Sequence, residues 1–257
     1  MSNIHPTAIV SQDGDIEQSV KIGAYSIVEN TVVIGPGTEI SSHVRIDPFT
    51  RIGKNCKIFH GAVLGSIPQD LKFKGEHSEL IIGDDTTIRE YATIHRGTAA
   101  SGKTEIGNHC FVMNYAHVAH DCKIGNHVIL SNAASLAGHI VIEDYAIVGG
   151  LVPIHQFVRI GTHAFVGGGY RVNQDIPPYI LAAGEPLKFF GMNYVGLRRN
   201  SFSEEQIKSL EKAYHLIYRS KLNTSGALQA IKDEMEMTKE ITNVIQFIER
   251  SERGIIK

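Results

Sequence analysis

An aliphatic residue recurs at every sixth position over about two thirds of the chain, and this period constrains the fold more than any other feature. Counted in steps of six from Ile4 to Val172, 26 of the 29 positions hold Ile, Val or Leu. The exceptions are Asp70, Glu76 and Ala100, and the period resumes in phase after each polar stretch that contains them. We therefore expect one unbroken repeat with loops inserted near residues 69–80 and 98–105.

A period of six fits neither an α-helix nor a simple β-strand, but it fits a short strand followed by a turn. Each such strand pairs with the strand one full coil away, so the stacking of coils builds the core. Small or β-branched residues form a second column four positions after each aliphatic residue, and the three cysteines Cys56, Cys110 and Cys122 all lie in it. We predict that they are small buried apolar side chains. Quartets such as Ile-Gly-Pro-Gly and Ile-Gly-Asp-Asp predict turns with positive φ.

The repeat ends near Val172, where prolines 177 and 178 interrupt strand pairing. Residues 203–206, Ser-Glu-Glu-Gln, form a capping box, and apolar residues then follow at helical spacing up to Tyr218. Further helices are expected at about 225–237 and 240–251. We predict a parallel β-helix domain over residues 1–176 and a small C-terminal α-helical domain over 177–257, which covers the open end of the β-helix.

Charge and composition exclude several classes of function. The formal net charge is −2, whereas a nucleic-acid-binding domain is usually basic. No apolar run approaches the roughly 18 residues that span a bilayer, and the first residues lack the pattern of a signal peptide. Three cysteines without an export signal argue against a disulfide framework. We expect a cytoplasmic protein that neither binds nucleic acid nor inserts into a membrane.

The densest candidate for catalysis surrounds the pair His120-Asp121. An imidazole, with an unperturbed pKa of about 6.5, suits a general base at neutral pH, and a neighbouring carboxylate can orient the ring. Steps of 18 residues, three hexapeptides, lead from His120 to Gly138 and Gln156, and from Asp121 to His139. These residues should therefore stack in adjacent coils, with a backbone N–H at the glycine for a tetrahedral oxyanion. A break in the 18-residue coil between residues 118 and 160 would refute this prediction.

Seven motifs spread over nearly the whole chain are more specific than the repeat: Gln69-Asp70-Leu71-Lys72, Ile94-His95-Arg96-Gly97-Thr98, Ala116-His117-Val118-Ala119-His120-Asp121-Cys122, Leu136-Ala137-Gly138-His139, His155-Gln156-Phe157, Gly191-Met192-Asn193 and Ala213-Tyr214-His215-Leu216-Ile217-Tyr218-Arg219-Ser220. Together they resemble the acyl-carrier-protein–UDP-N-acetylglucosamine O-acyltransferases of lipid A biosynthesis, a family of hexapeptide-repeat acyltransferases.

The resemblance implies a left-handed parallel β-helix with three hexapeptides in each triangular coil. It implies transfer of an (R)-3-hydroxyacyl chain from acyl carrier protein to the 3-hydroxyl of UDP-N-acetylglucosamine, the first step of lipid A biosynthesis. It further implies a homotrimer with active sites between subunits, and a reaction that needs no cofactor and no metal.

The resemblance also implies a role for individual residues. His120 resembles the general base, Asp121 its orienting partner and Gly138 the oxyanion-hole donor. Gly168 resembles the residue that ends the acyl groove and sets the chain length. Residues that resemble substrate-binding groups are Gln69, Asp70, Lys72, His117, His139, His155, Gln156, Asn193 and Arg199.

The sequence leaves several alternatives open. Gly138 and Gly168 are also compatible with ordinary turns, and Asp70 and Lys72 with a solvated loop. Val195 and Asn200 stand where the family commonly has an acidic residue and a second arginine near the nucleotide, which leaves N-acyl transfer to a 3-amino sugar nucleotide as an alternative reaction.

Two other kinds of protein also fit the repeat. A metal-dependent enzyme similar to γ-type carbonic anhydrase needs three histidines on zinc, and only His117 and His120 are evident. A non-catalytic β-helix would favour repetitive Thr-rich faces and would not need the His-Asp pair.

Overall fold

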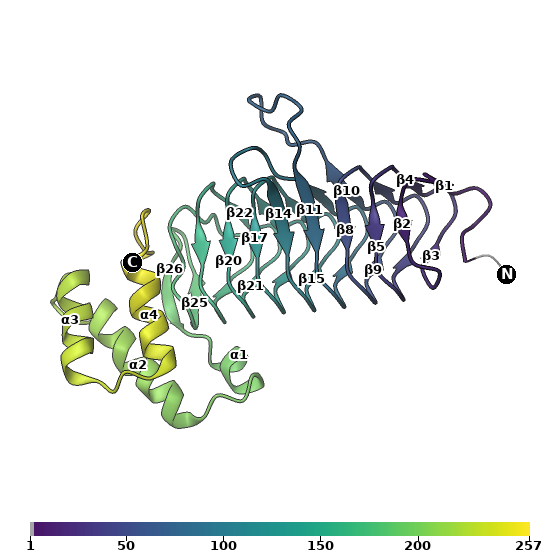
Figure 1. Ribbon diagram of the computed structural model, residues 1–257. Coiled ribbons are helices and arrows are strands. Elements are labelled where there is room, and N and C mark those ends of the chain that lie inside the picture. The colour runs from purple at the N-terminus through teal and green to yellow at the C-terminus, as the bar shows by residue number, and fades with distance from the viewer. Residues whose placement is uncertain (1–2) are drawn as a thin grey trace.

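The computed structural model describes residues 3–257, which form an elongated prism of short strands with helices at its C-terminal end (Figure 1). The strands of the prism wind in a left-handed parallel coil that contributes one strand to each of three sheets per turn. Over the described residues, two sheets have eight strands each and the third has ten. The fold class predicted from the repeat and from the family resemblance is confirmed.

Sheet 1 consists of β1 (Ile9–Val10), β4 (Ile27–Val28), β7 (Arg45–Ile46), β10 (Val63–Ser66), β13 (Thr93–His95), β16 (His117–Val118), β19 (Ser135–Leu136) and β22 (Pro153–Ile154). Sheet 2 consists of β2 (Asp15–Ile16), β5 (Val33–Ile34), β8 (Thr50–Ile52), β11 (Glu79–Ile82), β14 (Lys103–Ile106), β17 (Lys123–Ile124), β20 (Val141–Ile142) and β23 (Arg159–Ile160). Sheet 3 consists of β3 (Lys21–Ile22), β6 (Glu39–Ile40), β9 (Lys57–Ile58), β12 (Thr87–Ile88), β15 (Phe111–Val112), β18 (Ile129–Leu130), β21 (Ile147–Val148), β24 (Phe165–Val166), β25 (Ile180–Ala183) and β26 (Lys188–Met192).

The core of the prism is built from the two columns seen in the sequence. In most two-residue strands the first side chain points outward and the aliphatic second one is buried. The second column completes the interior, and Cys56, Cys110 and Cys122 are free thiols that are at most 2% exposed. Burial raises the pKa of the Cys110 thiol to about 11 and that of Cys122 to about 12. The prediction that the cysteines are buried apolar side chains is confirmed.

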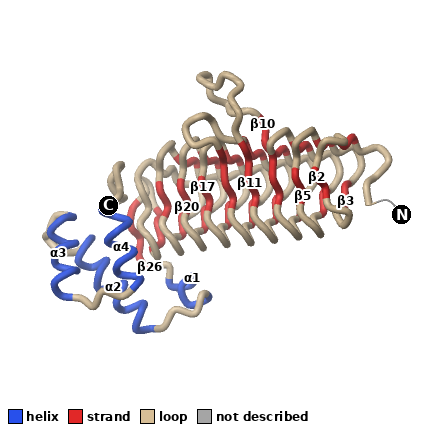
Figure 2. The backbone as a smooth tube through the Cα atoms, in the orientation of Figure 1, coloured by secondary structure: helices blue, strands red, loops and turns tan. Residues whose placement is uncertain are grey.

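Both inserted loops leave the period intact because each one adds a multiple of six residues to the coil. Strands of a regular coil pair 18 residues apart, as Ile9 does with Ile27. The partners Val63 and Thr93 are 30 residues apart, and Thr93 and His117 are 24 apart, so the insertions add 12 and 6 residues. The loops comprise residues 67–78 and 96–102, each between a strand of sheet 1 and the next strand of sheet 2 (Figure 2). We call this edge of the prism the first corner; sheets 2 and 3 meet at the second corner, and sheets 3 and 1 at the third.

The turns correct one expectation about glycine. Positive φ occurs three residues after the aliphatic residue, and mostly at side chains other than glycine, such as Asn55, Asp85 and Tyr145. The glycine directly after the aliphatic residue has an ordinary φ. A Cβ atom on Gly35 would lie 2.8 Å from the backbone of the next coil at Gly53. Glycine at this position is therefore required by the close approach of successive coils, and not by the turn.

Sheet 3 continues past the predicted domain boundary at residue 176. β25 pairs in parallel with β24, and β26 then returns antiparallel to it. The helical part begins only at α1 (Tyr194–Arg199) and continues with α2 (Glu204–Tyr218), α3 (Thr224–Glu234) and α4 (Lys239–Glu249). The capping box at Ser203 is present, with Gln206 as its reciprocal partner. Within residues 3–257, no helix has the length and apolar character needed to cross a membrane.

Candidate active site

The register predicted for the candidate site is confirmed. Val118 pairs with Leu136 and Leu136 with Ile154, so the coil keeps its 18-residue length through this region. His120 and Gly138 each follow two residues after these partners and therefore lie in successive coils of the first corner. The His139 amide donates a hydrogen bond to the His120 carbonyl at 3.1 Å, and the Phe157 amide donates to the Gly138 carbonyl at 3.3 Å.

His120 and Asp121 form a buried pair. The Nδ1 atom of His120 lies 2.7 Å from Oδ2 of Asp121, and the two residues are 6% and 8% exposed. Because the carboxylate is an acceptor, this contact places the proton on Nδ1 and leaves Nε2 as the basic atom. Asp121 has a φ of 59°, the left-handed turn conformation found at the other corners, and this turn directs its side chain beside the imidazole.

Gly138 is required by the imidazole and not by a turn. Its φ is outside the positive range, whereas a Cβ atom there would lie 2.6 Å from Cε1 and 2.8 Å from Nε2 of His120. Any side chain would therefore displace the ring. Among the described residues, the Gly138 N–H has no hydrogen-bond acceptor. A free backbone donor on a residue that packs against the basic imidazole can stabilise the oxyanion of an acyl-transfer intermediate.

The second inserted loop holds the Asp121 carboxylate. The Thr98 amide donates to Oδ1 at 3.0 Å and its hydroxyl donates to Oδ2 at 2.7 Å; the amide and hydroxyl of Ser101 both donate to Oδ1. Burial by itself raises the pKa of this carboxyl, but the hydrogen bonds from Ser101, Thr98 and His120 outweigh it and lower the pKa to about 2. Asp121 is therefore an anion throughout the neutral range and stabilises a positive charge on His120.

Thr98 and Ser101 were missed as functional residues at the level of sequence. Thr98 belongs to one of the seven motifs, but the motif does not indicate what the side chain contacts. Both residues lie in the six-residue insertion that replaces a regular turn of the coil. The sequence feature that could have indicated their role is the presence of short polar residues in an insertion that lies one coil before the His-Asp pair.

Other predicted residues surround this pair. His139 stands edge-on to His120 with ring centroids 5.1 Å apart, and its Nε2 lies 3.8 Å from the Asp121 carboxylate. His155 and Gln156 are exposed in the next coil of the same corner. His117 lies instead on the outer face of β16, where its Nδ1 contacts the Thr93 hydroxyl at 2.8 Å. Burial lowers the pKa of His117, which favours its neutral form.

The metal-ligand pair considered for a carbonic-anhydrase-like enzyme does not form, since His117 and His120 lie on different parts of the coil. In the described part of the chain, the residues whose ligand atoms come within 4.8 Å of one another are His120, Asp121 and His139. Both oxygens of Asp121 already accept hydrogen bonds from the loop and from His120. This donor set fits a base with its orienting carboxylate better than it fits three free ligands.

Gln69, Asp70 and Lys72 lie on the first inserted loop, which projects from the prism (Figure 2). Gln69 and Lys72 are exposed, and the Asp70 carboxylate accepts a hydrogen bond from the Lys72 amide at 2.9 Å. Within residues 3–257, no recorded hydrogen bond or ion pair joins these three side chains to the His120 pair. The loop that carries them leaves the prism at the same corner as the His120 pair.

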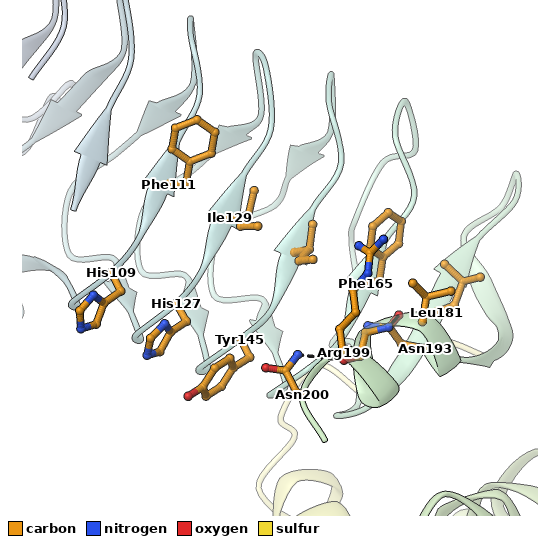
Figure 3. Close-up of a pocket in the computed structure, with 13 residues that line it drawn as sticks. His109, Phe111, His127, Ile129, Tyr145, Phe165, Leu181, Asn193, Arg199 and Asn200 are labelled. Atoms are coloured by element: carbon orange, nitrogen blue, oxygen red, sulfur yellow. Dashed lines mark hydrogen bonds between the residues drawn. The ribbon is translucent and has the colours of Figure 1, made fainter. Parts of the chain in front are cut away.

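Asn193 and Arg199 lie elsewhere, beside the second corner. They line a cavity of about 660 Å³ between the outer face of sheet 3 and α1, together with aromatic and aliphatic side chains (Figure 3). Asn193 caps α1 by accepting a hydrogen bond from the Gly196 amide at 3.1 Å, and its Nδ2 donates to the His163 carbonyl at 2.9 Å. Val195 and Asn200 line the same cavity.

Gly168 lies after β24 at the third corner. A Cβ atom on it would come within 3.1 Å of the Gly150 carbonyl oxygen, and its neighbour Gly169, with a φ of +79°, is the residue the turn requires. The predicted site residues are thus divided among three corners of one prism, and the single chain brings together only the His120 group.

Two family models match the chain. The model described as UDP N-acetylglucosamine O-acyltransferase, domain 2, matches residues 175–256, and the bacterial transferase hexapeptide model matches residues 103–138. Among curated proteins, the acyl-[acyl-carrier-protein]–UDP-N-acetylglucosamine O-acyltransferase of Thermodesulfovibrio yellowstonii is 48% identical over 100% of both chains. The enzyme of that name from Sulfurihydrogenibium sp. is 54% identical, over 99% of this chain and 94% of its own.

Solved structures agree in both fold and sequence. A UDP-N-acetylglucosamine acyltransferase from Bacteroides fragilis superposes with a TM-score of 0.97 and 46% identity, over 98% of this chain and 99% of that chain. The enzyme from Francisella novicida superposes with a TM-score of 0.95 and 40% identity, over 98% and 93% of the two chains.

Proposed function

The chain belongs to the UDP-N-acetylglucosamine O-acyltransferases, and from this premise we propose that it transfers an (R)-3-hydroxyacyl chain from acyl carrier protein to the 3-hydroxyl of UDP-N-acetylglucosamine. The two curated relatives are named for this nucleotide sugar and for an acyl carrier protein. Their sequence similarity extends over 99–100% of the present chain. In this role the protein catalyses the first step of lipid A biosynthesis, in the cytoplasm.

The observation that carries the proposal is the buried His120–Asp121 pair, whose imidazole packs against Gly138 so closely that a Cβ atom there would lie 2.8 Å from Nε2. Nε2 of His120 removes the proton from the sugar 3-hydroxyl, and the resulting oxygen attacks the thioester carbonyl carbon. The new C–O bond forms a tetrahedral intermediate, whose negative oxygen accepts a hydrogen bond from Gly138. When the C–S bond breaks, the thiol of the carrier protein takes the proton from His120. No redox partner or cofactor is needed.

Asp121 accepts a hydrogen bond from Nδ1 of His120 and so keeps the neutral imidazole in the tautomer whose free Nε2 accepts the sugar proton. Its negative charge then stabilises the imidazolium that forms during attack. A single hydrogen-bond donor at an oxyanion is typically worth about 10²–10³ in rate, and a general base about 10²–10⁴. These two residue roles therefore account for a substantial part of the expected acceleration without further chemistry.

The division of the other residues among three corners supports a homotrimer in which each site forms between subunits. In that assembly, the sugar and the acyl group are held by the loop residues Gln69, Asp70 and Lys72, by His117 on β16, and by the corner residues His139, His155 and Gln156. Asn193 and Arg199, from the cavity beside the second corner of a neighbouring chain, hold the uridine diphosphate. Gly168 ends the acyl groove, where the absence of a side chain leaves room for a long chain.

The test is a transfer assay with purified protein, UDP-N-acetylglucosamine and 3-hydroxyacyl carrier proteins of several chain lengths. We expect an ester at the sugar 3-position and a preference for a long acyl chain. A matched acceptor with a 3-amino group distinguishes ester from amide formation. Failure to acylate UDP-N-acetylglucosamine with any of the donors would refute the proposal. Sedimentation of the same preparation tests the trimer.

A further inference from the structure

Arg96 is a buried arginine without an acidic partner among the described residues. It is 8% exposed, its Nη1 donates to the Pro48 carbonyl at 3.4 Å, and its Nε has no hydrogen-bond partner. The guanidinium lies instead beside two aromatic rings, 5.4 Å from the centroid of Phe49 and 5.7 Å from that of Phe73. A cation removed from water without a counter-ion is costly, so cation–π attraction is the main compensation recorded here.

The two rings belong to different parts of the molecule. Phe49 lies on the body of the prism, just before β8, while Phe73 lies in the middle of the loop that carries Asp70 and Lys72. The guanidinium is therefore placed between the prism and the loop.

The first inserted loop is otherwise held only near its ends. At its start, the Ile67 carbonyl contacts the His95 ring at 2.7 Å, and the Ser66 carbonyl accepts from the Arg96 amide at 3.1 Å. Near its end, the Glu76 carboxylate accepts from the Ala99 amide at 3.2 Å.

Between these anchors, the hydrogen bonds of residues 69–75 stay within the loop. The Phe73 amide donates to the Asp70 carbonyl, the Lys72 amide to the Asp70 carboxylate, and the Lys74 amide to Glu76. Among the described residues, the contact of the Phe73 ring with the Arg96 guanidinium is the one polar or ring contact that joins this stretch to residues outside the loop. It follows Asp70 by three residues and Lys72 by one.

We propose that Arg96 is a positioning residue that clamps Phe73 against the prism and so fixes Asp70 and Lys72 in the place from which they bind substrate. The inference rests on the proposed function, because it gives these two loop residues a substrate to hold. The clamp requires a cation and an aromatic face, so a variant that keeps the apolar volume but loses the aromatic ring distinguishes it from plain apolar packing. It acts on binding and not on the bond-forming step, since neither Arg96 nor Phe73 contacts the His120 pair.

The experiment compares Phe73→Leu, which keeps apolar bulk and removes the aromatic face, with Phe73→Tyr, which keeps the face. The matched control is Phe59→Leu. Phe59 is also half-buried and lies 4.6 Å from the guanidinium of Arg89, but this pair is remote from the first corner. Steady-state kinetics give KM for UDP-N-acetylglucosamine and kcat for each variant, and amide hydrogen exchange of residues 69–75 is measured on the same proteins without substrate.

For Phe73→Leu we expect KM to rise about three- to thirtyfold with kcat changed less than about twofold, the range expected for loss of one cation–π contact. Exchange in residues 69–75 should accelerate. Phe73→Tyr should restore both values to those of the unmodified protein, and Phe59→Leu should alter neither. Arg96→Lys, which keeps the charge but loses the planar face, should fall between Phe73→Leu and Phe73→Tyr.

Equal KM values for Phe73→Leu and Phe59→Leu would overturn the clamp, as would a Phe73→Tyr variant as impaired as Phe73→Leu. Failure of the proposed function gives a different result, because the unmodified protein then transfers no acyl group. In that case the exchange data still decide whether Phe73 holds the loop: unchanged exchange in Phe73→Leu would overturn the inference on its own.

Discussion

Histidines occupy the same left-handed turn position at all three corners of the prism, and the first and second corners give them different surroundings. At the first corner, His139 has a φ of 62° and adjoins the His120–Asp121 pair. At the second corner, His109, His127 and His163 have φ values of 55–56° and stack in one column with Tyr145. Figure 3 shows His109, His127 and Tyr145 of this column. The backbone repeat is therefore shared, and the chemistry is not.

Rings at the second corner stack face to face. His127 and Tyr145 have centroids 4.6 Å apart, and Tyr145 and His163 4.7 Å, with interplanar angles of 7° and 4°. His163 has a buried Nδ1 without an acceptor, and burial lowers its pKa to about 4. It is a neutral packing group, although it is a histidine in the same kind of turn.

Inserted loops account for the difference between the corners. At the first corner, six additional residues bring Thr98 and Ser101 onto Asp121, so a carboxylate is held ionised beside an imidazole. The coils that carry His127 and His163 at the second corner have regular 18-residue spacing, and successive rings pack on one another. The proposed catalytic site thus lies where the repeat is interrupted. Four predictions test this contrast, from the largest expected effect to the smallest.

Replacing His120 by Ala should lower kcat by about 10²–10⁴, because it removes the proposed general base while the chain keeps its coil. The control is His43→Ala at the third corner, a histidine with a φ of 59° that stacks near Tyr25. It should retain activity. Rates come from the transfer assay, and circular dichroism confirms that both variants fold. A fully active His120→Ala protein would reject the assignment.

The variant Gly138→Ala should lower kcat about 10²-fold, because its Cβ atom would displace the imidazole, and small displacements at a reacting centre have effects of this order. Gly14→Ala is the control, since its Cβ would lie no closer than 3.3 Å to the surrounding atoms. Comparable losses in the two variants would show that general coil packing, and not the position of His120, causes the effect.

Ser101→Ala removes one hydroxyl that donates a hydrogen bond to the Asp121 carboxylate. It should lower kcat about tenfold, within the range for loss of a hydrogen bond to a charged group. The carboxyl pKa, about 2 in the folded protein, lies below its ordinary 3.8. Its contribution to stability is therefore complete above pH 3.8 and is lost as the pH falls through about 2. Ser101→Ala should raise the folded pKa and reduce this contribution.

Acid unfolding followed by circular dichroism between pH 2 and 4 checks that change: the midpoint for Ser101→Ala should move to higher pH. Ser225→Ala, in the exposed first turn of α3, should leave both rate and midpoint unchanged. An unaltered rate and midpoint in Ser101→Ala would mean that the second loop does not support Asp121.

His163→Phe should preserve the stacked column and affect only the pH dependence of stability. In the folded protein the pKa of His163 is about 4, so its imidazole is neutral above that pH. In the unfolded chain the same imidazole binds a proton below about pH 6.5, and the folded protein therefore loses stability as the pH falls from 6.5 to about 4. The variant lacks this loss. Its Tm should match the unmodified protein at pH 7.5 and exceed it by about 2–4 °C at pH 5. Equal Tm values at pH 5 would contradict the prediction.

Much of the fold was predictable because the repeat is a local rule. The six-residue period predicts the β-helix, the buried cysteines and the positions of both loops, and its 18-residue multiple places Gly138 in the coil next to His120. The capping box at Ser203 likewise located the start of α2. In each case, neighbours in space follow from a constant separation along the chain.

The rest depends on contacts that no constant separation describes. Thr98 reaches Asp121, and Phe73 reaches Arg96, through loops whose paths are set by their own internal hydrogen bonds. The continuation of sheet 3 into β25 and β26 was also missed, because the prolines suggested an end where the coil only changes its spacing.

The sequence by itself determined the coil, its register and the His-Asp pair, since each aliphatic residue must be buried and the pleat then assigns every neighbour to a face. The tertiary structure decided that Thr98 and Ser101 of the second loop hold the Asp121 carboxylate beside His120. It also decided that Asn193 and Arg199 lie at a different corner from His120. These outcomes depend on where irregular segments fold back onto a regular scaffold, and that is governed by packing between residues far apart in the chain.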